Sequence, residues 1–105
     1  MHMKVNLKDG KTITLEWNAL IFEYLEEYEG GLEQLKEDAK EGSNKSHYAC
    51  NHMVYSVIAA NLDEPVTYRQ AIALVNLEDI KNILDFIINS SNKTLEKTSY
   101  NKHHK

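Results

Sequence analysis

The sequence predicts an α+β fold that is mostly α, with an N-terminal β-hairpin, four to five short helices and a polar C-terminal tail. Three observations predict it. Residues 4–17 alternate apolar and polar side chains, residues 18–89 repeat apolar side chains at helical spacing, and residues 90–105 show neither pattern. The chain has 105 residues, which suits one domain. We therefore assign residues 1–89 to a single α+β domain and the remainder to a flexible tail.

The hairpin is predicted over residues 4–17. In both strands every second residue is apolar, the set being Val5, Leu7, Ile13, Leu15 and Trp17. Asp9-Gly10 separates the two runs and predicts a tight two-residue turn. A lone hairpin is marginal in water, so its apolar face must pack on helices. Two outcomes stay open for its edges: addition to a partner's sheet, or protection by the neighbouring lysines.

Residues 18–40 are predicted to be helical, with Asn18 as the N-terminal cap. Their apolar side chains follow a heptad-like spacing: Ile21, Leu25, Tyr28, Leu32, Leu35 and Ala39. Gly30-Gly31 interrupts this stripe, and each glycine costs about 1 kcal/mol relative to alanine inside a helix. We expect the helix to bend or break there, with segments ending near Tyr28 and running from about Leu32 to Lys40.

The first of these segments is apolar beyond a narrow stripe, because Leu20, Phe22 and Tyr24 add to it. An apolar face of this breadth fits an oligomer interface. It equally fits a helix that faces the core of a small domain, so the sequence leaves both interpretations open.

Three further helices are predicted after the loop at Glu41–Asn44. The first covers residues 46–62, begins at a Ser46 cap, and is apolar around much of its circumference, which indicates the central helix. The second covers residues 67–75, where Thr67 and Gln70 form a capping box. The third covers residues 77–89 after an Asn76 cap, with an apolar stripe of Ile80, Ile83, Leu84, Ile87 and Ile88.

Charge is distributed unevenly along the chain. Residues 16–41 hold nine acidic residues against two lysines, a net charge of −7, whereas the whole chain carries −4. The acidic run is either a solvated helix face or a docking face for a basic partner. Nucleic-acid binding is not expected, because no basic patch with interleaved aromatic residues is present. The single cysteine, the absence of a signal-peptide pattern and the lack of a long apolar run favour a cytoplasmic protein without membrane contact.

No catalytic, cofactor-binding or metal-binding residues are predicted. His47, Cys50 and His52 lie close in the sequence, but a zinc site needs about four ligands, and no second ligand pair is present. Cys50 with His47 as base lacks a third residue to orient it, so an inert thiol is the preferred interpretation. We therefore expect a protein without enzymatic activity.

The hairpin KVNLKDGKTITLEW, the helices after it and the run TYRQAIALVNLEDIKNIL resemble the tail assembly chaperones of long-tailed (siphovirus-type) phages and prophages of Gram-positive bacteria. The resemblance covers roughly Met3 to Asn89. It implies a non-enzymatic protein that coats the tape measure protein, helps recruit tail tube subunits and is absent from the mature virion.

The resemblance also implies a homo-oligomer in the host cell cytoplasm. The candidate surface for the partner or for other copies is then Leu20, Tyr24 and Tyr28, together with the hairpin edge. The alternative is a small acidic regulatory or antitoxin-like protein-binding module, which would use the acidic helix against a basic partner. A tape measure gene beside the gene for this chain would favour the first interpretation.

Overall fold

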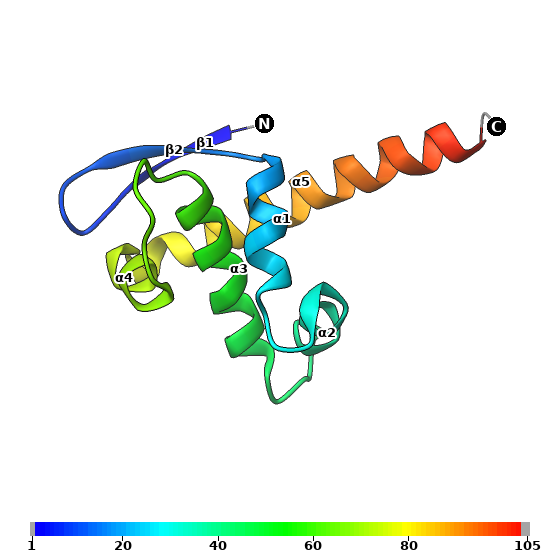
Figure 1. The fold of residues 1–105 in the computed structure, drawn as a ribbon, viewed down its shortest axis with the longest axis horizontal. Helices are drawn as coiled ribbons and strands as arrows, with labels where there is room; N and C mark the ends of the chain where they lie inside the picture. Colours follow the sequence, from blue (N-terminus) through cyan, green and yellow to red (C-terminus); the bar gives the residue numbers. More distant parts are fainter. Residues whose placement is uncertain (1, 104–105) are drawn as a thin grey trace.

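The structure is a computed structural model that describes residues 2–103, with side chains described as far as Lys93. In this part of the chain an N-terminal hairpin is followed by five helices, which confirms the predicted fold class (Figure 1). The elements are β1 (His2–Asn6), β2 (Thr12–Glu16), α1 (Ala19–Glu26), α2 (Gly31–Asp38), α3 (Ser46–Ala60), α4 (Tyr68–Leu74) and α5 (Leu77–His103).

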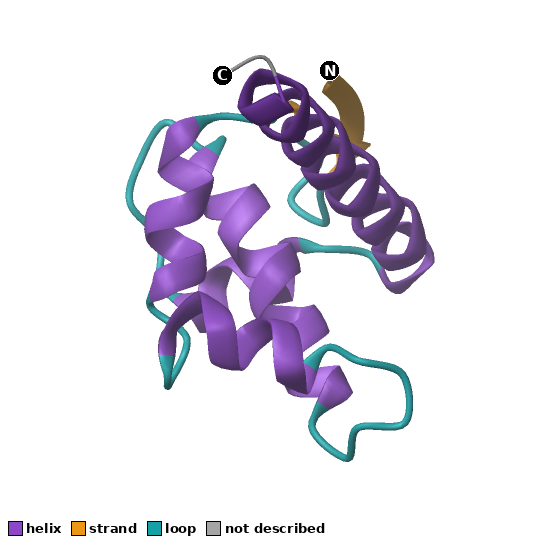
Figure 2. Cartoon of the chain, turned by 90° about the vertical axis from the view of Figure 1, so that its right-hand side faces the viewer, coloured by secondary structure: helices purple, strands orange, loops and turns teal. Residues whose placement is uncertain are grey.

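The other helices and the hairpin are arranged around α3. It contacts α1, α2, α4, α5 and β2, and α1 and α4 lie on opposite sides of it (Figure 1). In the view turned by 90°, α5 crosses the molecule with the first strand beside it (Figure 2). Val57 and Ile58 in α3 are fully buried, as expected for a helix that is apolar around most of its surface. The prediction of a central helix is confirmed.

The hairpin covers one end of this helical layer with its apolar face. β1 and β2 pair antiparallel, with Met3 opposite Leu15 and Val5 opposite Ile13. Val5 and Leu15 are buried, whereas the alternating Thr14 is exposed. The period of two in the sequence therefore separates a face toward the helices from a face toward solvent.

The prediction of a two-residue turn in the hairpin is wrong. Gly10 N donates to Leu7 O at 3.0 Å and Leu7 N donates to Lys11 O at 2.8 Å, so the loop has three residues, from Lys8 to Gly10. Asp9 Oδ1 accepts a bond from Lys11 N at 3.0 Å, which holds the aspartate inside the turn. Gly10 has φ +89°, so it takes the left-handed position that ends a three-residue hairpin loop.

Residues 18–40 form two helices, and the predicted cap and break are both confirmed. Asn18 Oδ1 accepts a bond from Ile21 N at 3.3 Å at the start of α1. Gly30 and Gly31 have φ values of +92° and +76°, which a continuing right-handed helix does not allow. The glycine pair therefore separates α1 from α2, and α1 ends at Glu26, slightly before the predicted end near Tyr28.

The predicted N-terminal cap is wrong for α3 and confirmed for α4. Ser46 is the first residue of α3, and Lys45 before it makes no capping bond with its side chain, so the predicted Ser46 cap is wrong. Thr67 caps α4 as predicted: its Oγ1 accepts from Gln70 N at 3.1 Å, and Gln70 Oε1 accepts from Thr67 N at 2.9 Å. Both bonds are local in sequence, which is why the pattern predicts them.

The predicted end of the last helix at residue 89 is wrong, because α5 continues to His103. No glycine or proline follows Pro65, so the sequence contains no strong helix breaker in this region. Ser90, which looks like the start of a polar tail, is 3% exposed and extends the buried face of the helix. The backbone of the predicted tail, residues 90–105, is thus helical as far as His103, and residues 104–105 lie outside the described part.

Candidate functional site

The three residues of the predicted partner surface lie on one flank of α1 and the segment after it. Leu20 is 42% exposed. Tyr24 and Tyr28 follow at intervals of four residues, and both are partly buried against the core. Of the three, Leu20 is thus the side chain most open to another polypeptide.

Tyr24 and Tyr28 belong to a group of rings from α1, the segment after it, α3 and α4. We call this group the tyrosine cluster: Tyr24, Tyr28, His52, Tyr55 and Tyr68. Tyr24 and Tyr55 meet edge to face with ring centres 5.4 Å apart. Tyr28 and His52 are 5.2 Å apart, and Tyr55 and Tyr68 are 5.4 Å apart. His52 Nε2 lies 2.8 Å from Tyr24 O, so α3 and α1 are also joined by a hydrogen bond.

The cluster is closed on one side and open on the other. Tyr55 is buried, and its hydroxyl donates to Glu27 Oε1 at 3.2 Å. Burial and the adjacent Glu27 carboxylate raise the pKa of Tyr55 to about 12, so this phenol is neutral at physiological pH. Tyr68 at the start of α4 is 41% exposed. A partner approaching the face of α3 that α1 and α4 flank would therefore meet tyrosine rings, which favour apolar and cationic groups.

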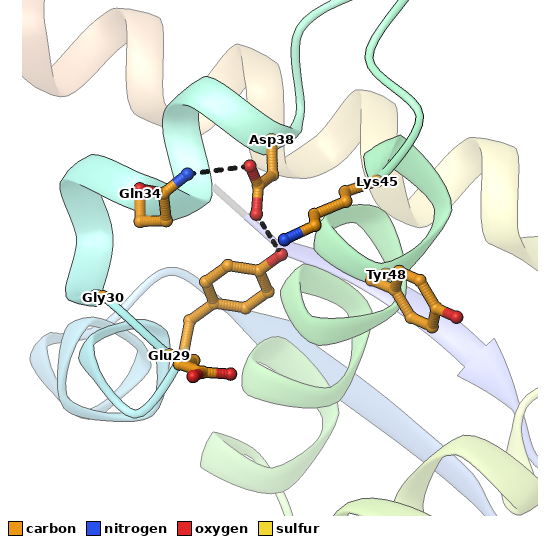
Figure 3. Close-up of a pocket in the computed structure, with 7 residues that line it drawn as sticks. Glu29, Gly30, Gln34, Asp38, Lys45 and Tyr48 are labelled. Carbon is orange, nitrogen blue, oxygen red and sulfur yellow. Dashed lines mark hydrogen bonds between the residues drawn. The ribbon is translucent and has the colours of Figure 1, made fainter.

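A second feature is a polar hollow of about 620 Å³ between the end of α1, α2 and the start of α3 (Figure 3). Tyr28 Oη donates to Asp38 Oδ2 at 2.6 Å, and Gln34 Nε2 donates to Asp38 Oδ1 at 2.8 Å. The hydrogen bond from Tyr28, with help from Gln34 and the charge of Lys45, lowers the pKa of Asp38.

The same hydrogen bond raises the pKa of Tyr28 to about 12. Asp38 is therefore ionised and Tyr28 neutral across the physiological range. Both groups thus keep one protonation state near neutral pH, whereas the most efficient general acids and bases titrate close to the operating pH. We interpret the pair as a connection that fixes α2 against α1 after the glycine break.

The histidines and the cysteine of α3 are separated by their contacts. His52 belongs to the tyrosine cluster, whereas the ring of His47 lies against Tyr48 with centres 4.0 Å apart. Cys50 is partly buried with a free thiol. Within the described part of the chain, no three or more His, Cys, Asp or Glu side chains are grouped closely enough to hold a metal ion.

Asparagine side chains and one backbone bond hold the hairpin edges to the helices. Asn61 binds both the N–H and the C=O of Glu16 at the edge of β2. At the edge of β1, Asn76 Nδ2 donates to Asn6 O at 3.0 Å. The turn is held as well, since Lys8 N donates to the carbonyl oxygen of Leu74 in α4 at 2.8 Å.

Sequence reasoning missed most of the exposed apolar side chains that the fold leaves at the surface. Besides Leu20 these are Phe22, Tyr48, Tyr68, Leu77 and Ile88. Phe22 packs edge to face on Trp17 at 5.5 Å, so α1 has exposed apolar groups on two flanks. The one available signal was the breadth of the apolar face of α1, which included Leu20 and Phe22.

The acidic run lies at the surface. Glu23, Glu26 and Glu27 in and after α1 are all exposed. In the described part of the chain, the ion pairs of this run lie in α2 and directly after it: Lys36 with Glu33 at 3.7 Å and Lys40 with Glu37 at 3.0 Å. The carboxylates of α1 are thus left without a basic side chain beside them.

None of the helices in the described region combines the length and the apolar character needed to span a bilayer. Comparison of the chain with protein families, curated proteins and solved structures gives no match.

Proposed function

We propose that this chain is a non-enzymatic tail assembly chaperone of a long-tailed phage or prophage, which coats the tape measure protein and helps recruit tail tube subunits in the host cytoplasm. The observation that carries the proposal is the exposed Leu20 on the same flank of α1 as the tyrosine cluster. The hairpin followed by helices, which the resemblance implies, supports it as well.

The proposed mechanism is the covering of an apolar helix of the partner. Leu20 on α1 and Tyr68 on α4 offer exposed apolar surface, and the ring contacts of Tyr24 with Tyr55 and of Tyr55 with Tyr68 link the two helices across α3. A segment of the tape measure protein that places its apolar stripe here would be removed from water and protected against aggregation. The reaction involves burial alone, so no bond is made or broken.

The proposed homo-oligomer would use the remaining exposed apolar side chains. Phe22 lies on the flank of α1 beside Trp17, and Leu77 and Ile88 lie on α5. Leu77, the first residue of α5, is 83% exposed, the highest value among the large apolar side chains that the structure describes. Contacts between copies at these residues leave the flank of Leu20 for the tape measure protein.

Co-expression with a tape measure protein encoded beside this chain's gene tests the proposal. We expect the tape measure protein to be soluble only in the presence of this chain, and to lose that solubility with Leu20→Asp. Ala19→Asp is a matched control, because Ala19 is the neighbouring exposed residue of α1 and an aspartate there suits the first helical turn. A tape measure protein that aggregates beside the wild-type chain, or that stays soluble with Leu20→Asp, would contradict the proposal.

One observation favours a second candidate, a small acidic regulatory or antitoxin-like module. Glu23, Glu26 and Glu27 are exposed and form no ion pair with the side chains that the structure describes, so their charges can attract a basic partner. Two of them also accept a hydrogen bond within the fold, Glu27 from Tyr55 and Glu26 from Leu32 N. Binding through these carboxylates would weaken steeply with salt, since exposed charges are screened within about 10 Å at 0.1 M. Self-association and partner binding that persist at 0.5 M salt would exclude this candidate.

A further inference from the structure

The outer edge of β2 has backbone groups that the hairpin itself does not use. Val5 pairs with Ile13 and Lys4 pairs with Thr14 in the register of the two strands. Since Leu7 N bonds to Lys11 O, every second pair from that point is hydrogen-bonded within the hairpin. The N–H and C=O groups of Thr12 and Thr14 consequently point away from β1, toward the place of a third strand.

At Glu16, the next outward-facing residue on this edge, the side-chain amide of Asn61 already binds the backbone. Asn61 Oδ1 accepts from Glu16 N at 3.0 Å, and Asn61 Nδ2 donates to Glu16 O at 3.1 Å. This is the pair of bonds that the backbone of a neighbouring antiparallel strand would make with Glu16. The side chain of α3 thus imitates the end of a third strand, and Thr12 and Thr14 are the two positions that would continue it.

The edge of β1 is more restricted. Asn76 holds the carbonyl oxygen of Asn6, and Lys8 N donates to Leu74 O. One outward position remains between His2 and Asn6, and it belongs to Lys4, whose charged side chain disfavours strand addition. The two edges therefore differ, and β2 is the one open to pairing.

A groove of about 570 Å³ lies at the open edge, between the start of β2 and the α3–α4 loop. Its charged residues are Asp9, Asp63 and Glu64 against Lys11, an excess of two negative charges. Its apolar lining comes from Ile13, Leu62, Val66 and Leu74. A segment that fits this groove is extended, carries basic side chains and alternates them with apolar ones.

We propose that the edge of β2 at Thr12 and Thr14 binds an extended, basic segment of a partner protein as a third antiparallel strand. The proposal depends on the chain being a protein-binding factor, as proposed above, and it adds a second contact separate from Leu20. The partner's backbone makes the hydrogen bonds, while its basic side chains meet the acidic rim and its apolar ones cover Ile13.

Two peptides of equal composition test the backbone contact. The probe is the acetylated and amidated pentapeptide Lys-Val-Lys-Val-Lys, observed through the amide NMR signals of Thr12 and Thr14. In the expected register two of the three lysines lie opposite these threonines. N-methylation of those two lysines therefore removes the bonding N–H groups, whereas N-methylation of the two valines leaves them. We expect the first modification to weaken binding at least about fivefold and the second to change it little.

A pair of protein variants tests the same contact by changing the strand instead of the peptide. Thr14→Pro removes an outward N–H without touching the bonds between β1 and β2, and Lys4→Pro makes the same change at its cross-strand partner. We expect only Thr14→Pro to reduce binding of the pentapeptide. Equal weakening by both variants, equal binding of both methylated peptides, or signal changes confined to α1 would overturn the proposal.

Two further results separate this proposal from its alternatives. A dimer of the protein alone that Thr14→Pro abolishes, without peptide binding, would assign the edge to a second copy and contradict the proposal. If the tape measure protein is kept soluble by the wild-type chain and by Thr14→Pro alike, the edge plays no part and the chaperone proposal stands. If the pentapeptide binds the edge but the tape measure protein does not bind the chain, the chaperone proposal fails and the strand-edge proposal stands.

Discussion

Replacement of Asn61 by alanine should detach the hairpin from the central helix. The side chain makes three hydrogen bonds: one from Glu16 N, one to Glu16 O, and one at 2.9 Å from Nδ2 to Val57 O. Asn61 also follows the last residue of α3, where carbonyl groups lack helical partners. The substitution thus removes the side chain that joins two elements 45 residues apart in the sequence.

The magnitude follows from the number of bonds and their exposure. A hydrogen bond contributes about 0.5–1.5 kcal/mol, and water replaces part of each one because Asn61 is only partly buried. We expect a loss of about 2 kcal/mol in the free energy of unfolding. For a chain of this size that corresponds to a fall of roughly 8–16 °C in Tm.

Thermal and urea unfolding followed by circular dichroism at pH 7 would measure this loss. Asn82→Ala is the matched control, because Asn82 is exposed on α5, and it should change the free energy of unfolding by less than about 0.5 kcal/mol. Equal small effects for both variants would refute the argument that Asn61 holds the hairpin.

Asn61→Asp adds a test by pH. The new carboxylate would face the carbonyl oxygens of Glu16 and Val57 at the C-terminal end of α3, so its pKa in the folded state should be raised. An acid with a raised folded pKa destabilises the protein above its unfolded pKa of about 4 and recovers stability below it. We expect this variant to be at least as unstable as Asn61→Ala at pH 7, and to approach the wild type as the pH falls below about 4.

Three further predictions concern the helices. Thr67→Ala removes the cap of α4 and should cost about 1 kcal/mol in urea unfolding. Gly30→Ala should cost at least about 1–2 kcal/mol, because φ is +92° and the new Cβ would lie 2.6 Å from the Cβ of Gln34. Tyr28→Phe should reduce the loss of stability on acidification. The lowered pKa of Asp38 gives stability that is complete above its unfolded value of 3.8 and lost as the pH falls through the lower folded value, and Tyr28 is its largest cause. An unfolding series from pH 5 to pH 2 would show the difference.

Local chemistry explains the parts of the fold that the sequence predicts. Thr67 and Gln70 are three residues apart, and Gly30-Gly31 needs no distant partner to end a helix. The sequence predicts too short an α5, because Ser90 looks polar although tertiary packing buries it. The predicted hairpin loop is one residue too short, because the Asp9 side chain bonds to Lys11 N and favours the longer loop.

The candidate site is harder to predict, because it is assembled from distant segments. The tyrosine cluster joins Tyr24 with Tyr55 and Tyr68, whose spacing in the sequence carries no pattern. The bond from Asn76 to Asn6 links residues 70 positions apart. Whether the strand edges are open or occupied depends on such contacts, and periodicity does not report them. The breadth of the α1 face did indicate Leu20, because exposure on a helix follows its local spacing.

We propose above that the chain acts by burying the apolar surface of another polypeptide. Calorimetric titration with a helical segment of the tape measure protein, at several temperatures and at 0.05 M and 0.5 M salt, tests it most directly. We predict a negative heat-capacity change and a Kd that varies less than about threefold with salt, because apolar burial gives the first and ionic contacts alone would give a steep salt dependence. No binding, or a Kd that rises more than about tenfold at high salt without a heat-capacity change, would contradict the account.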